Sequence, residues 1–104
     1  MSKISKVTDS NIFEFIQSPM TILQFSAEWC GPCRMLGPII DELATDNPTI
    51  TVGKVNVDDN SSATAKFGIR GIPAVIIFKD GVEVERVVGV FNKASFQAKI
   101  DALK

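Results

Sequence analysis

The sequence predicts an α/β fold in which a mixed β-sheet carries helices on both faces. Segments with strand patterning alternate with segments in which apolar residues recur at helical spacing, in the order β-α-β-α-β-α-β-β-α. Strands joined through a helix are expected to run parallel, whereas Asp80-Gly81 is a strong hairpin turn that makes the last two strands antiparallel. The chain has a length typical of one domain and contains no linker, so we expect residues 1–104 to form a single domain.

Apolar patterning and residues that end a helix indicate the first three elements. Residues 4–7 are a weak strand candidate, and the helix that follows is expected to be capped by one of residues 8–10 and to end at Pro19. Residues 20–26 predict a strand that is buried on both faces and interrupted by Gln24.

A long helix is predicted from the cysteine pair to about Asn47, just before Pro48. Its apolar residues form one stripe at helical spacing: Leu36, Ile39, Ile40 and Leu43. Pro38 lies inside this helix and removes one backbone hydrogen bond, so we expect a kink there.

Alternation, turns and caps indicate the remaining elements. Residues 50–58 alternate between two faces as a strand does, and a short helix over residues 62–67 ends at Gly68. The wholly apolar run 74–78 predicts a buried strand before the hairpin turn, and Asn92 is expected to cap the last helix.

Charge and hydropathy exclude several classes of partner. Eleven basic and twelve acidic residues leave a net charge of −1, which argues against a nucleic-acid surface and a polybasic membrane anchor. The chain has no run of about 20 apolar residues that would span a membrane. Residues 1–6 lack the apolar segment of a secretory signal, so we expect a cytoplasmic, reducing setting.

The two cysteines of the chain, Cys30 and Cys33, follow its one tryptophan, Trp29. They lie between an apolar strand and a helix, where free backbone N–H groups and the helix dipole favour a negative charge. Cys30 is therefore expected to be acidified and nucleophilic, and the spacing lets the pair close into a disulfide and open again. Two alternatives are a zinc site and a pair of inert core thiols. A zinc site needs four ligands, and only a dimer sharing the ion would supply them. The spacing of the cysteines between Trp29 and Gly31-Pro32 argues against inert thiols. We expect no bound metal.

Four segments resemble those of the thioredoxin family, in order and at similar spacing: Ala27-Glu28-Trp29-Cys30-Gly31-Pro32-Cys33, Lys54-Val55-Asn56-Val57-Asp58, Gly68-Ile69-Arg70-Gly71-Ile72-Pro73 and Gly89. The resemblance covers almost the whole chain. It implies a thioredoxin fold, with a central mixed five-stranded sheet flanked by four helices. It also implies a thiol-disulfide oxidoreductase that reduces disulfides in partner proteins.

The resemblance further implies how the cysteines divide the work. Cys30, the exposed thiol, attacks a disulfide of a client protein, and Cys33, the shielded thiol, attacks Cys30 and releases the reduced client. Gly31 and Pro32 form the active-site loop; Pro32 stiffens the ring, and this dipeptide is typical of a reductant. Electrons are expected from thioredoxin reductase or an equivalent, with no cofactor besides the disulfide, and the protein is expected to be a monomer.

A substrate platform is the next implication of the resemblance. Pro73 is similar to the family's cis-proline, and Ile72 is expected to offer its backbone N–H and C=O to an extended client segment. Trp29, Gly71 and Gly89 complete this expected platform. The simpler interpretations are that Trp29 is ordinary core and that Gly71-Ile72-Pro73 is only a turn.

The chain departs from the family at Gln24, where most members carry a buried aspartate that pairs with a lysine at Lys54. An amide cannot titrate, so we expect slower resolution by Cys33 and a simpler cysteine titration. Lys54, without its carboxylate, is expected to reach solvent, become partly neutral or act on the thiols. Lys54 as a solvated strand residue and Gln24 as a satisfied core amide are the simpler alternatives.

A second function stays open at this point. Thioredoxin folds also serve as non-catalytic binding subunits of larger enzymes, and such a subunit would not need an efficient proton relay at Gln24. A disulfide-forming or isomerising role is a third option, against which the Gly-Pro dipeptide and the absence of a signal segment both count.

Overall fold

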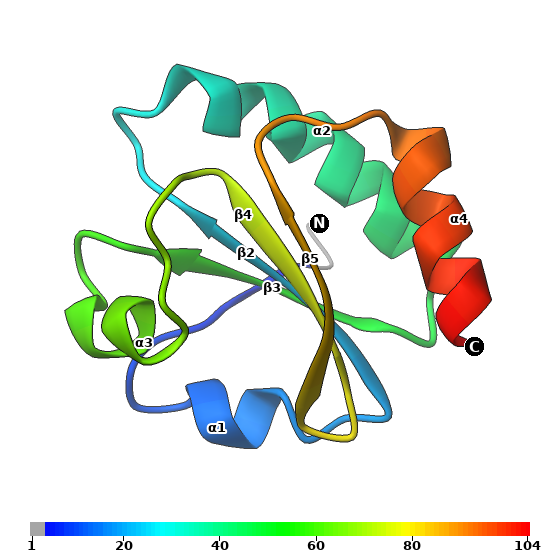
Figure 1. Cartoon of the computed structure of the whole chain (residues 1–104), viewed down its shortest axis with the longest axis horizontal. Coiled ribbons are helices and arrows are strands. Elements are labelled where there is room, and N and C mark those ends of the chain that lie inside the picture. Colours follow the sequence, from blue (N-terminus) through cyan, green and yellow to red (C-terminus); the bar gives the residue numbers. More distant parts are fainter. Residues whose placement is uncertain (1–3) are drawn as a thin grey trace.

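The computed structural model describes residues 4–104. This part of the chain forms five strands and four helices in the predicted order (Figure 1). Their bounds are β1 (Ile4–Lys6), α1 (Ile12–Phe15), β2 (Met20–Ser26), α2 (Gly31–Asp46), β3 (Thr51–Asn56), α3 (Ser61–Lys66), β4 (Ala74–Lys79), β5 (Val82–Val88) and α4 (Lys93–Leu103).

The five strands form one mixed sheet in the order β1-β3-β2-β4-β5. β3 pairs in parallel with β1 and with β2, whereas β4 pairs antiparallel with both β2 and β5. The expectation that all strands joined through helices run parallel is therefore wrong for β4, which follows α3.

The direction of β4 follows from the length of its connection. The six residues of α3 span only about 9 Å, whereas the six residues of β3 span about 20 Å. α3 is thus too short to carry the chain back along the sheet. β3 ends opposite Ser26, and β4 starts opposite Phe25, so the chain re-enters the sheet at the end from which it left.

Helices cover both faces of the sheet (Figure 1), and each face carries a hydrophobic core. On one face, α2 and α4 bury Leu36, Ile40, Leu43, Phe96 and Ile100 against the strands. On the other face, α1 and α3 bury Ile12 and Ala63 against a cluster that includes Leu23, Phe25 and Phe78. β2 lies between both cores and is buried at all seven residues, as expected. Burial of these side chains is the main stabilising contribution to the fold.

Turns and caps match the sequence predictions except at α1, which ends at Phe15, before the expected stop at Pro19. Asp80 and Gly81 both have positive φ, as the hairpin requires, and the Asn92 side chain accepts a hydrogen bond from the Ser95 N–H at 2.8 Å. The expected cap of α1 within residues 8–10 is wrong, because Asn11 is the N-cap residue. Its side-chain oxygen accepts from the Thr8 N–H at 2.8 Å, so it closes the preceding turn instead of capping the helix.

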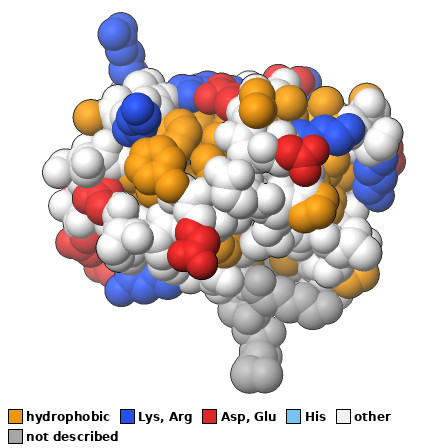
Figure 2. All heavy atoms as spheres, turned by 90° about the horizontal axis from the view of Figure 1, so that it is seen from below, with side chains coloured by type: hydrophobic (Ala, Val, Ile, Leu, Met, Phe, Trp, Pro, Cys, Tyr) orange, Lys and Arg blue, Asp and Glu red, His pale blue; other side chains and the backbone are white. Residues whose placement is uncertain are grey.

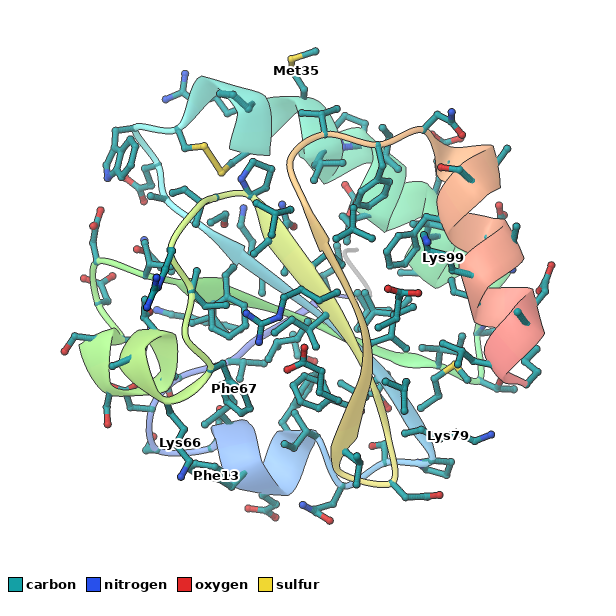
Figure 3. All side chains as sticks on the ribbon, viewed as in Figure 1. Phe13, Met35, Lys66, Phe67, Lys79 and Lys99 are labelled. Carbon is teal, nitrogen blue, oxygen red and sulfur yellow. A yellow bond between two sulfur atoms is a disulfide. The ribbon has the colours of Figure 1, made fainter. Side chains whose placement is uncertain are left out.

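The α1 side of the molecule exposes hydrophobic side chains among charged and polar ones (Figure 2). Phe13 of α1 is 53 % exposed, and its ring centroid lies 6.2 Å from that of Phe67. Figure 3 shows these two residues close together, with Lys66 beside them. This surface lies away from the disulfide, which is at the start of α2 (Figure 3).

Candidate active site

Cys30 and Cys33 occupy the first turn of α2 and form a disulfide, with their Cα atoms 5.3 Å apart. Cys30 is the N-cap residue and has an extended backbone, and Cys33 follows inside the helix. β2 ends at Ser26, so a four-residue connection separates a fully buried strand from the helix that carries the pair. The expected strand-to-helix turn is confirmed.

The backbone of this turn favours negative charge on Cys30. The Cys33 N–H donates a hydrogen bond to Cys30 Sγ at 3.2 Å, in the manner of a side-chain N-cap. The same N–H and the positive end of the α2 dipole are directed at this sulfur. Both features favour negative charge on this sulfur.

The expected difference in exposure between the two cysteines is wrong for this disulfide form. Cys30 and Cys33 are each 4 % exposed. They pack with Ala27 into a small cluster that Val57 and Ile72 cover. The cause is that Cys30 Sγ points towards Cys33 and the helix N-terminus, so neighbouring side chains close over it.

Trp29 lies on the surface beside the cysteines and is 69 % exposed, so its interpretation as ordinary core is wrong. Its indole Nε1 donates to Asp58 Oδ2 at 2.8 Å. Sequence reasoning quoted Asp58 only as part of a motif and missed this role. No local pattern indicates the contact, because 29 residues separate the two.

The segment Gly71-Ile72-Pro73 lies beside the disulfide, since Ile72 packs on the cysteine cluster. The peptide bond between Ile72 and Pro73 is cis, as the resemblance implied. Gly89, which has a φ of 98°, donates its N–H to the Pro73 carbonyl at 2.8 Å, so it lies next to this segment. Within the described part of the chain, the Ile72 backbone makes no hydrogen bond, and it is therefore free to pair with another strand.

Gln24 and Lys54 are paired across neighbouring strands β2 and β3. Gln24 is 1 % exposed, and its Nε2 has no hydrogen-bond partner among residues 4–104, so its interpretation as a satisfied core amide is wrong. Lys54 is exposed. Of its three expected outcomes, it therefore reaches solvent, and the expected buried cation does not arise.

A groove of about 730 Å³ opens beside Cys33, between α2 on one side and β1, β2 and β3 on the other. Gln24, Lys54 and Cys33 all line it, so the structure brings one cysteine of the pair together with Gln24, which departs from the family pattern, and with Lys54, which keeps it. Sequence reasoning did not identify Asp41, which also lines the groove. Cys33, Gly37 and Asp41 are four residues apart in turn, so they lie on one face of α2. This spacing could have identified Asp41 from the sequence.

Two further properties concern ions and membranes. In the part of the chain that the structure describes, no group of three or more histidine, cysteine, aspartate or glutamate side chains is arranged to hold a metal ion. None of its helices has both the length and the apolar character that crossing a bilayer requires.

Known proteins resemble this chain along almost its whole length. A family model described as Thioredoxin matches residues 3–102. A thioredoxin of Chlamydia pneumoniae is 47% identical over 87 residues, which cover 84% of this chain and 85% of the relative. A thioredoxin of Staphylococcus haemolyticus is 46% identical over 99 residues, covering 94% and 95%.

A solved structure agrees with these sequence relatives. A mutant thioredoxin from Halobacterium salinarum NRC-1 superimposes with a TM-score of 0.88 at 30% identity, over 98% of this chain and 93% of that one. The family-model match, the relatives and the disulfide-forming pair agree with one another. This chain belongs to the thioredoxin family and is a thiol-disulfide oxidoreductase, a protein-disulfide reductase with a redox-active centre at Cys30 and Cys33.

Proposed function

We propose that Cys30 is the attacking cysteine of this reductase and that Cys33 is the resolving one. The observation that carries the assignment is the hydrogen bond from the Cys33 N–H to Cys30 Sγ at the helix N-terminus. It stabilises negative charge on one sulfur of the pair. The 5.3 Å between the Cα atoms keeps the second thiol close enough for intramolecular attack.

The proposed reaction has two exchange steps. The Cys30 thiolate attacks one sulfur of a client disulfide, and the other client sulfur leaves as a thiolate that takes up a proton. Cys33 then loses its proton and attacks Cys30 Sγ. The Cys30–Cys33 disulfide forms, and the second client sulfur leaves and is protonated. Two electrons and one proton, delivered by thioredoxin reductase or an equivalent dithiol donor, then restore the Cys30 thiolate and the Cys33 thiol.

We propose that clients bind on a platform made by Trp29, Gly71, Ile72, Pro73 and Gly89, with Gly31 and Pro32 forming the active-site loop. The exposure of Trp29 and the free Ile72 backbone support this proposal. An extended segment that pairs with the Ile72 backbone uses main-chain hydrogen bonds, which every sequence offers. Such a platform suits a reductase with many clients.

We propose that Gln24 and Lys54 tune Cys33. Gln24 hydrogen-bonds but does not exchange protons, so the Cys33 proton passes directly to solvent in the groove. This should make resolution slower than in a relative with a carboxylate at this position.

The wider assignment follows from family membership. We propose that residues 1–104 form one monomeric domain that acts in the cytoplasm, exchanges electrons with thioredoxin reductase and client proteins, and needs no cofactor besides its disulfide. A purely structural binding subunit is not favoured, since the relatives are named thioredoxins and the cysteine pair is poised to form a disulfide.

Reduction of insulin with dithiothreitol as the electron source tests this proposal. The native chain should be active, and Cys30→Ser and Cys33→Ser should each abolish turnover. A mixed disulfide with the client should accumulate on Cys30 in the Cys33→Ser variant, and none should form in Cys30→Ser. Trapping on Cys33 in the Cys30→Ser variant would reverse the assignment.

A further inference from the structure

The loop that contains Ile72 and Pro73 runs from the end of α3 to the start of β4, over residues 67–73 (Figure 1). It is neither helix nor strand. Within the described part of the chain, the backbone of residues 70–72 forms no hydrogen bond. Contacts at the two ends of the loop and along its side therefore hold it in place.

The loop begins with a turn that closes α3. Gly68, which has a φ of 62°, and Ile69 donate their N–H groups to two carbonyls of α3, at 3.1 and 3.0 Å. This is a Schellman motif, which uses two of the carbonyl groups left free at a helix end. The carbonyl of Phe67, the C-cap residue, accepts from Arg86 Nη2 at 2.7 Å. A side chain of β5 thus fixes the residue at which the loop begins.

Glu83 of the same strand orients Arg86 for this contact. Nε and Nη2 of Arg86 donate to the two carboxylate oxygens of Glu83, each at 2.8 Å. A two-point pair of this kind fixes the plane of the guanidinium group. Nη2 therefore bonds to both the carboxylate and the Phe67 carbonyl. The Arg86 side chain is 29 % exposed, so these bonds are partly shielded from water.

β5 contacts the loop at two further points. A Cβ built on Gly71 would lie 3.3 Å from Val88 Cγ1, so the backbone of Gly71 lies against the Val88 side chain. Gly89 donates its N–H to the Pro73 carbonyl at 2.8 Å. The side chains of Arg86 and Val88 lie on the same face of β5, because they are two residues apart. β5 thus contacts the loop at its start, in its middle and at its end.

We propose that Arg86 is a positioning residue for client binding: it fixes the start of the loop, so that β5 holds the Ile72 backbone ready to pair with a client. This inference rests on the client platform proposed above. A backbone segment that is already ordered loses less conformational entropy when a client pairs with it. The hydrogen bonds of Arg86 go to Phe67 and Glu83 and not to the cysteines, so its role concerns client binding and not the exchange chemistry.

Two substitutions at Arg86 test this role. Arg86→Met keeps an unbranched side chain without donors, whereas Arg86→Lys keeps one charged nitrogen that can replace Nη2. Arg86→Met should raise the KM for insulin about fivefold with kcat unchanged, because only binding is weakened. Arg86→Lys should recover most of this loss. Both variants should reduce hydroxyethyl disulfide, a small disulfide without a peptide backbone, at the native rate.

Lys79→Met is the matched control. The Lys79 ammonium group donates to the Leu103 carbonyl at the end of α4 at 2.8 Å, so this change also removes a cation that bonds to a carbonyl at a helix C-terminus. Lys79 lies at the end of β4 that is remote from the disulfide (Figure 3). Lys79→Met should therefore leave the KM for insulin unchanged.

NMR relaxation of the backbone amides tests the loop separately from client reduction. The order parameters of residues 68–72 should fall in Arg86→Met and keep their native values in Arg86→Lys and Lys79→Met. Native order parameters in Arg86→Met would overturn the inference, because Arg86 would then not hold the loop. Lower order parameters with an unchanged KM would overturn the client platform and, with it, the role of Arg86. An equal loss of rate with insulin and with hydroxyethyl disulfide would also overturn the inference, because the substitution would then act on the cysteines.

Discussion

The indole Nε1 of Trp29 donates a hydrogen bond to Asp58 Oδ2 at 2.8 Å. This contact joins the loop before the disulfide to the loop after β3, because Asp58 lies two residues beyond the end of that strand. It explains how a side chain that is 69 % exposed keeps a defined orientation. A large aromatic surface held rigid in solvent loses little conformational entropy when a partner covers it. The hydrogen bond therefore orders the proposed client platform before a client arrives.

Asp58→Ala should release the indole. Loss of one hydrogen bond, worth about 1 kcal/mol, should raise the KM for insulin roughly fivefold with little change in kcat. Trp29 is the one tryptophan of the chain, so a fall in fluorescence anisotropy reports its release directly. Asp59→Ala is the matched control, because Asp59 is a neighbouring exposed residue whose side chain does not contact the indole. An unchanged anisotropy in Asp58→Ala would show that the contact does not hold the ring.

Gln24→Asp should accelerate release of the client. A carboxylate at this buried position, facing Lys54, can exchange a proton with Cys33 and should speed resolution by at least about tenfold. The pH profile of turnover should gain one more titration. Stopped-flow decay of the mixed disulfide measures the step, with Gln24→Asn as the non-titrating control. Equal turnover and an equal pH profile in native chain and Gln24→Asp would refute the proposed tuning.

Gly53→Ala should destabilise the fold. A Cβ at Gly53 would lie 2.5 Å from a ring carbon of Phe15 and 2.5 Å from a methyl group of Val7, so the side chains of Phe15 in α1 and of Val7 after β1 would have to move. Overpacking of this kind costs about 1–3 kcal/mol. Gly37→Ala is the control, because nothing lies within 4 Å of its Cβ position and alanine favours a helix over glycine by about 1 kcal/mol. Urea unfolding should show opposite shifts in midpoint for the two variants.

Lys93 of α4 should stabilise the protein in a pH-dependent way. Its pKa is raised, mainly by a side-chain hydrogen bond to Asp46 of α2 and further by the charges of Asp46 and Glu42, against an opposing effect of desolvation. A raised pKa means that the folded state binds this proton more tightly. The contribution is therefore complete below the ordinary lysine pKa of about 10.4 and is lost as the pH rises through the higher folded value.

Lys93→Gln should accordingly lower the urea midpoint slightly at pH 8 and low salt. The difference from the native chain should vanish at about 1 M salt and above the folded pKa, because salt screens exposed pairs and deprotonation removes the charge. Lys66→Gln, which removes an exposed lysine without an ion pair among the described residues, should have no such effect. A salt-independent difference would mean that Lys93 acts through packing.

Features determined by a few neighbouring residues could be predicted without the structure. The Asp80-Gly81 turn, the Asn92 cap and the N-terminal position of the cysteine pair on α2 all depend on local backbone geometry and hydrogen bonds. The identity of a few residues decides such features, because the interacting groups lie within one or two turns of each other.

The direction of β4 could not be predicted in this way. Both a parallel and an antiparallel strand suit the apolar run at residues 74–78 of β4. The choice depends on how far α3 carries the chain, and therefore on three-dimensional distance. The burial of Cys30 is similar, because Val57 and Ile72, which cover it, come from segments far along the chain.

The amino-acid sequence was sufficient for the fold class, the element order and the redox chemistry, because periodicity, turn residues and the cysteine spacing each act locally. Tertiary structure was needed for the Trp29–Asp58 hydrogen bond and for the groove in which Lys6, Lys54 and Gln24 meet Cys33. These residues become neighbours only when strands pair and α2 packs across them, and the free energy that brings them together comes from burying the two cores.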